Sequence, residues 1–252
     1  MIRVRNLSKS YGNKKVVDDV SLDIHKGELI SFIGSNGAGK STVLSIVSRL
    51  ISGNQGQVYI DDKEISQWGK NELAKKISIL RQANYMNIKL KVRELVSFGR
   101  FPYSQGRLTE EDNYHIDKAI EYMHLEEFEH RYIDELSGGE RQRAFIAMVI
   151  AQNTEYIFLD EPLNNLDMKH SVEIMKILRK LVKDLKKTVI IVIHDINFAA
   201  CYSDYIVALK NGRVVEEGRT EHIINSGVLK TIYDLDINIH EVEGRRICHY
   251  FA

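Results

Sequence analysis

A glycine-rich loop between a predicted strand and a predicted helix most limits the folds open to this chain. The strand covers the mostly apolar residues 30–33, the loop GlySerAsnGlyAlaGlyLysSer covers residues 34–41, and the helix is predicted to begin near Thr42. Glycines let a backbone fold tightly, and the first turn of a helix presents N–H groups and partial positive charge. This order of strand, loop and helix is that of a P-loop, which binds nucleotide phosphates.

The motif predicts a task for each part of the loop. We expect Lys40 to reach the β- and γ-phosphates of ATP and the Ser41 hydroxyl to bind Mg²⁺, which prefers oxygen ligands. A glycine-rich turn between a strand and a helix, with a coincidental lysine and serine, is the alternative, but a chance match of this spacing in this setting is rare. The loop residues predicted to contact the nucleotide are Gly34, Ser35, Asn36, Gly37, Ala38, Gly39, Lys40, Ser41 and Thr42.

A second apolar strand ends in two carboxylates. Residues 156–159 are apolar, and Asp160 and Glu161 follow them directly. Such a strand is usually core, but its carboxyl end lies at the sheet edge where α/β folds bind ligands. We therefore predict that Asp160 holds Mg²⁺ or its waters and that Glu161 is the general base that polarises the attacking water.

Predicted strands and helices alternate along most of the chain, which indicates an α/β fold. The predicted strands are residues 2–5, 20–24, 28–33, 57–60, 77–80, 156–159, 188–193, 205–209 and 213–216. The predicted helices are residues 41–50, 169–185 and 220–226 onward, with a long helical region from 92 to 152.

We predict one domain, residues 1–252, with a P-loop NTPase (RecA-like) core, an antiparallel β subdomain and an inserted helical subdomain. Residues 1–84 and 153–236 are expected to form the core with its β subdomain. The strand-poor residues 85–152 are expected to form the helical subdomain. Residues 237–252 are left as a C-terminal tail to which the sequence assigns no role.

Composition argues against several classes of protein. The chain has 35 Lys and Arg against 35 Asp and Glu, so it lacks the basic excess that attracts nucleic acid, and no nucleic-acid partner is expected. Its two cysteines, Cys201 and Cys248, have no metal-ligand spacing, which favours a reducing cytoplasm. No run approaches the roughly 18 to 20 apolar residues that span a bilayer, so a membrane role would require a partner.

Residues 136–140, LeuSerGlyGlyGlu, followed by Arg141 and Gln142, resemble the signature motif of the ABC ATPase family. Ser137 and Glu140 also fit the capping-box pattern at the start of a helix, and both interpretations can hold together. The resemblance implies that Ser137, Gly138, Gly139 and Glu140 contact the nucleotide bound to an opposing subunit.

Further residues resemble elements of that family and occur in its order. Tyr11 resembles the aromatic residue that stacks on adenine, and Val16 is placed beside the nucleotide with it. Gln82 resembles the Q-loop glutamine, which contacts the nucleotide and Mg²⁺. Asp167 ends a segment similar to the D-loop, and His194 resembles the catalytic switch histidine.

The resemblance implies an ATPase that uses ATP and Mg²⁺ and works as a head-to-tail homodimer. The signature motif of one subunit would face the P-loop of the other, with two ATP molecules between them. Hydrolysis removes the phosphate that both subunits contact, so the closed dimer changes stability with nucleotide state and can drive a conformational cycle.

Residues 92–103 and 161–170 resemble ATPases of ferric siderophore, haem and cobalamin importers, and a ferric siderophore system of the petrobactin type is favoured. The resemblance implies two transmembrane permease subunits, an indirect substrate-binding protein and a peripheral place at the cytoplasmic face of the cell membrane. Residues 83–104 are expected to dock the permease. The side chains expected there are Tyr85, Met86, Phe101 and Tyr103.

Other functions stay open at this point. The ATPase of a haem or cobalamin importer, or of an exporter, fits the same motifs. A non-transport ABC ATPase is less well supported, because there is one P-loop, one signature motif and no basic excess. A nucleotide kinase would share the P-loop but leave the signature motif, Gln82 and His194 without a role.

Overall fold

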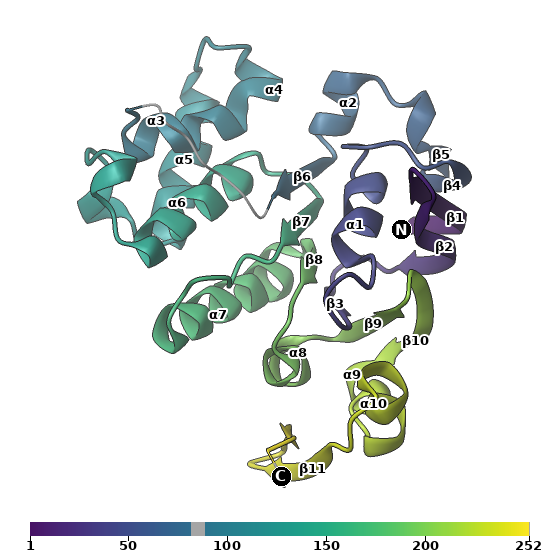
Figure 1. Cartoon of the computed structure of the whole chain (residues 1–252). Coiled ribbons are helices and arrows are strands. Elements are labelled where there is room, and N and C mark those ends of the chain that lie inside the picture. The colour runs from purple at the N-terminus through teal and green to yellow at the C-terminus, as the bar shows by residue number, and fades with distance from the viewer. Residues whose placement is uncertain (82–88, 252) are drawn as a thin grey trace.

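The computed structural model describes residues 1–81 and 89–251, and a six-stranded sheet lies at its centre (Figure 1). The strand order is β10-β9-β3-β8-β7-β6, with β10 antiparallel to β9 and the other pairs parallel. These strands are β3 (Leu29–Ile33), β6 (Ile77–Leu80), β7 (Tyr156–Asp160), β8 (Thr188–Val192), β9 (Tyr205–Lys210) and β10 (Arg213–Arg219).

Both faces of this sheet are covered, so its central strands β3, β7 and β8 are buried at every position. Alternate residues of β3, β7 and β8 enter two different cores. One core includes α1 (Lys40–Val47) and the antiparallel sheet, and the other includes α7 (Met168–Leu185) and α8 (Ile196–Tyr202). The parallel strands therefore end at one edge that both layers hold in place.

The second sheet is antiparallel and has the strand order β2-β1-β4-β5. Its strands are β1 (Ile2–Tyr11), β2 (Lys14–Ile24), β4 (Gln55–Ile60) and β5 (Lys63–Glu64). The first two strands are longer than predicted, because their outer parts carry exposed polar residues that a search for apolar runs does not detect.

Asp61, just after β4, connects this sheet to the central one. Its carboxylate pairs with Lys26 at 2.8 Å and Lys76 at 2.8 Å, and the Tyr156 hydroxyl donates to it at 3.0 Å. Partial burial opposes ionisation, but these donors together hold the pKa of Asp61 well below its usual range. The cluster thus stabilises the contact between the two sheets in the charged form of Asp61.

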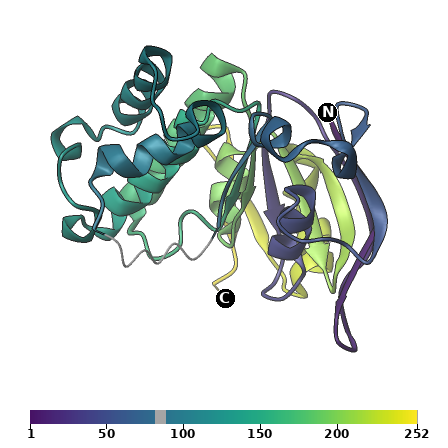
Figure 2. The same cartoon turned by 90° about the horizontal axis from the view of Figure 1, so that it is seen from above.

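Helices between β6 and β7 form a group beside the sheets (Figures 1 and 2). A buried ion pair holds it together: Arg100 Nε donates to Asp112 Oδ1 at 2.8 Å, and Arg100 Nη1 donates to the Ala151 carbonyl at 3.0 Å. The group contains α3 (Val92–Ser97), η2 (Phe98–Arg100), α4 (Phe101–Ser104), α5 (Glu110–Tyr122), η3 (Glu126–Phe128), η4 (Ile133–Glu135) and α6 (Gly138–Ala151). The prediction of an α/β fold with an antiparallel sheet and inserted helices is confirmed.

Several short elements did not appear among the predicted ones. The residues assigned to the tail contain a hairpin, β11 (Asn238–Val242) and β12 (Arg245–His249), which packs on α8. The Asn197 side chain on α8 fixes that contact, because it accepts from Cys248 N at 2.7 Å and donates to Cys248 O at 3.2 Å. Helix α8, η1 (Ile65–Gln67) and α2 (Lys70–Ala74) were also not predicted, whereas the helix predicted from residue 220 onward is divided into α9 (Thr220–Ile223) and α10 (Ser226–Tyr233). Within the described residues, no helix is long and apolar enough to cross a membrane.

Candidate nucleotide site

The P-loop joins β3 to α1 and needs its glycines for two separate reasons. Gly34, Gly37 and Gly39 have φ values of 136°, 77° and 98°, a region that side chains disfavour. A Cβ atom on Gly34 would lie 2.0 Å from the Leu209 carbonyl oxygen, and one on Gly39 would lie 2.7 Å from the Val16 carbonyl oxygen. The loop therefore keeps its shape only with glycine at these positions.

Lys40 lies under the loop rather than in solvent. It is buried, and its Nζ donates to the carbonyl oxygens of Gly34 at 2.8 Å and Ser35 at 2.9 Å. Burial lowers the pKa of Lys40, and the nearby carboxylates Glu161 and Asp160 offset part of this effect. The ammonium group is therefore placed beside the backbone that would surround the phosphates.

Ser41 and Asp160 meet at the edge of the sheet. Ser41 Oγ donates to Asp160 Oδ1 at 2.7 Å, which joins the start of α1 to the end of β7. Burial raises the pKa of Asp160, the hydrogen bond from Ser41 opposes this rise, and the negative charge of Glu161 adds to it. Two adjacent hard oxygen donors with an excess of negative charge suit Mg²⁺.

Glu161 and His194 follow β7 and β8 and come together at the same edge. His194 Nε2 lies 2.7 Å from Glu161 Oε1, and Asn164 Nδ2 donates to Glu161 Oε2. The Glu161 side chain is 10% exposed, whereas that of His194 is 37% exposed. Both carboxylate oxygens are therefore held in defined positions beside the P-loop.

Two adjoining hollows contain the P-loop, Glu161 and His194 together. The first is lined by Val16, residues 36–42, Glu161 and His194. The second is lined by residues 34–37, Asn164 and Tyr233 in addition to the same glutamate and histidine. Sequence reasoning missed Tyr233, because an aromatic residue at the end of an amphipathic helix has the pattern of ordinary core.

Tyr11 is not brought into these hollows by the structure. Tyr11 ends β1 with 53% of its surface exposed and is absent from both linings, with the Lys9 ammonium 5.4 Å from its ring. Gln82 lies outside the described residues, as do Tyr85 and Met86. The roles given to these residues stay predictions.

The signature residues stand at the start of α6. Ser137 Oγ accepts from Glu140 N at 3.3 Å, and Glu140 Oε2 accepts from Ser137 N at 2.8 Å, so the capping box is formed. Ser137, Gly138, Gly139 and Glu140 are absent from the linings of both P-loop hollows. The exposed helix start is therefore available to a ligand outside the chain's own P-loop.

The signature helix contacts the loop that follows Glu161. A Cβ atom on Gly139 would lie 2.7 Å from the His170 ring, so only glycine allows this contact. Asp167 caps α7 and holds that ring, because its Oδ1 lies 2.9 Å from His170 N and 2.8 Å from His170 Nδ1. Gln142 Nε2 also donates to the Pro162 carbonyl at 2.9 Å. The signature motif and the segment similar to the D-loop thus form one packed surface.

Residues 17–164 match the family described as ABC transporter. The chain belongs to the ABC transporter family. A petrobactin import ATP-binding protein of Bacillus subtilis (strain 168) is 63% identical to this cassette over 252 residues, covering 100% of both chains. Another, of Bacillus anthracis, is 46% identical over 239 residues and covers 95% of this cassette and 96% of that protein.

A solved structure with 34% sequence identity has the same architecture. It is a dimeric ATP-binding cassette in a post-hydrolysis state bound to ADP and phosphate, with a TM-score of 0.77, and the match covers 87% of this cassette and 99% of that chain. This ABC cassette is accordingly an ATPase that binds ATP. The sequence resemblance to the ABC ATPase family is confirmed.

Proposed function

We propose that this cassette powers a ferric siderophore importer whose cargo is petrobactin or a closely related chelate. The observation that carries the proposal is the 63% identity, over the full length of both chains, to a petrobactin import ATP-binding protein. A second relative with the same stated cargo, at 46% identity, supports it. Haem import, cobalamin import and export remain the competing functions.

Uptake by cells that lack this cassette tests the proposal. We expect ⁵⁵Fe-petrobactin uptake to be lost and to return with the unaltered chain. A Lys40→Ala variant, which lacks the P-loop ammonium, should not restore it. Normal petrobactin uptake together with lost haem or cobalamin uptake would assign the cassette to one of those importers. Normal uptake of all three would leave the exporter function or a non-transport ATPase.

We further propose that the cassette is a head-to-tail homodimer at the cytoplasmic face of the cell membrane, held there by two transmembrane permease subunits. A substrate-binding protein would act on the far side of the membrane. The chain would act as one unit, residues 1–252, with residues 85–152 as its helical signature subdomain. The support for the dimer is that the signature residues lie outside the P-loop hollows of their own chain.

In the proposed mechanism, the P-loop and the residues beside it bind the phosphates of ATP with only small changes of contact. Lys40 exchanges the carbonyls of Gly34 and Ser35 for oxygens of the β- and γ-phosphates. Ser41 and Asp160, with Gln82 as a further ligand, would hold Mg²⁺, which would offset part of the phosphate charge. The loop N–H groups and the start of α1 supply the remaining positive potential.

Glu161 then accepts the proton of the attacking water. One of its oxygens must first exchange its present partner for that water, and Oε1 is suited to this because the partner His194 is partly exposed. His194 can then donate toward the γ-phosphate while Asn164 keeps the carboxylate oriented. The opposing signature helix would complete the site by placing its N–H groups at the same phosphate.

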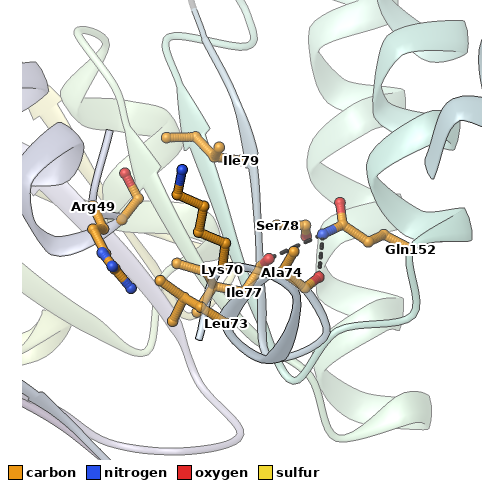
Figure 3. Close-up of a pocket in the computed structure, with 9 residues that line it drawn as sticks. Arg49, Lys70, Leu73, Ala74, Ile77, Ser78, Ile79 and Gln152 are labelled. Carbon is orange, nitrogen blue, oxygen red and sulfur yellow. Dashed lines mark hydrogen bonds between the residues drawn. The ribbon is translucent and has the colours of Figure 1, made fainter. Parts of the chain in front are cut away.

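The proposed permease surface lies where the helical group meets the core (Figure 3). A pocket at this place is lined by α2, β6 and Gln152, whose Nε2 donates to the Ala74 and Ile77 carbonyls at 2.5 Å and 3.1 Å. Arg49 and Lys70 add positive charge to its lining. We infer that a short cytoplasmic helix of the permease docks here with a carboxylate toward these cations.

Phe101 and Tyr103, which were expected to dock the permease, are absent from the lining of this pocket and differ in exposure. Phe101 is 59% exposed, and its neighbour Phe98 is 50% exposed, so both are accessible to a partner. Tyr103 is partly buried, with the Arg100 guanidinium 3.9 Å and the Lys75 ammonium 5.0 Å from its ring centre. Truncation of Tyr103 would therefore disturb the helical group as well as docking, and Phe101 is the better residue for testing the surface.

A further inference from the structure

Tyr233, the last residue of α10, has a hydroxyl group that the proposed mechanism does not use. The hydroxyl oxygen is buried and, among the residues that the structure describes, has no hydrogen-bond partner of good geometry. Burial raises the pKa of Tyr233 to about 12, and the nearby backbone N–H of Gly34 offsets part of this rise. The group therefore stays protonated and keeps one hydrogen to donate.

This hydroxyl belongs to a residue that lines a functional hollow. Tyr233 borders the space shared by residues 34–37, Glu161, Asn164 and His194. In the proposed mechanism the γ-phosphate lies on this side of the P-loop. A buried donor without an acceptor is unfavourable for the fold, so its retention beside an anion site suggests that the acceptor is a ligand.

Two contacts hold Tyr233 at a fixed place relative to the P-loop. Lys210, at the end of β9, donates to the Thr231 carbonyl at 2.8 Å and to Asp234 Oδ1 at 2.7 Å, on either side of Tyr233. Strand β9 pairs in parallel with β3, the strand that leads into the loop. A hydroxyl positioned by the same sheet as the P-loop can act as a preorganised donor.

We propose that Tyr233 is a further residue of the nucleotide site and that its hydroxyl donates a hydrogen bond to the γ-phosphate of ATP. The inference rests on the proposed position of that phosphate beside Glu161 and His194. ADP lacks this acceptor, so Tyr233 contributes to the preference of the cassette for ATP over ADP.

The test compares Tyr233→Phe with the unaltered chain, because phenylalanine keeps the ring and removes only the hydroxyl. Affinities for ADP and for β,γ-imido ATP, which is not hydrolysed, are measured by calorimetry, and the melting temperature is measured without nucleotide. We expect about fivefold weaker binding of the ATP analogue, ADP affinity within about twofold, and an unchanged or higher melting temperature. Tyr122→Phe, in α5, is the matched control and should change none of these values.

Four other results would contradict the inference or the nucleotide site on which it rests. Equal effects on ADP and the analogue, or a lower melting temperature with unchanged affinities, would overturn the inference and make the hydroxyl structural. A lower rate of ATP hydrolysis with unchanged analogue affinity would also overturn it, since the hydroxyl would then act on water. Failure of the unaltered chain to bind the analogue would overturn the proposed nucleotide site itself.

Discussion

Replacing Glu161 by glutamine removes a proton acceptor and changes little else in the site. The side chain is nearly buried, its Oε1 faces His194 Nε2 at 2.7 Å, and its Oε2 accepts from Asn164. Glutamine has the same shape and can keep one acceptor oxygen toward either partner, but it cannot take a proton from water. General-base catalysis contributes roughly 10²- to 10⁴-fold, or about 3 to 5.5 kcal/mol of activation free energy.

We therefore expect Glu161→Gln to slow phosphate release by about 10²- to 10⁴-fold while ATP binding is retained. The measurements are steady-state phosphate release and light scattering with ATP, since ATP that is not hydrolysed should hold the dimer closed. Glu127→Gln, an exposed carboxylate in the helical group, is the control and should behave like the unaltered chain. Turnover within tenfold of the unaltered rate would refute the assignment of Glu161 as base.

Three further predictions concern stability and docking. Arg100→Met leaves Asp112 buried without its partner and should lower the free energy of unfolding in urea by about 3 to 5 kcal/mol; a loss under 1 kcal/mol would contradict this. Asp61→Asn should destabilise the chain at neutral pH. Because the pKa of Asp61 is depressed in the fold, that difference should shrink as the pH falls below about 4, and melting curves at several pH values would check it. Lys70→Glu should reduce co-purification of the permease, whereas Lys176→Glu on α7 should not, and equal recovery would remove the pocket from the docking surface.

The sequence was most informative where a local motif and its flanking elements agree. The P-loop could be predicted because its glycines, lysine and serine stand between an apolar strand and a helix start. The acidic pair after residues 156–159 and the histidine after residues 188–193 could be predicted to lie together, because parallel strands end at one sheet edge. The structure places Glu161 and His194 in contact there.

Other features depend on contacts between distant segments and left no local pattern. The hairpin of β11 and β12 is mostly exposed and polar, and its place is fixed by the Asn197 side chain some fifty residues away. Helix α8 is short and follows a strand closely, so apolar periodicity alone could not separate it from the core. In the sequence, Tyr233 has the pattern of a core residue. Only its position beside the P-loop indicates a role for its hydroxyl.

The sequence by itself determined the fold class, the phosphate-binding loop and the acidic pair, since these depend on residue type and on spacings of a few positions. Only the tertiary structure decided which side chains share the hollow, that Lys40 is folded against its own loop, and that the signature residues lie outside it. These facts follow from how the two sheets, α7 and the helical group pack together. Packing joins residues more than a hundred positions apart, and no local spacing in the chain encodes that geometry.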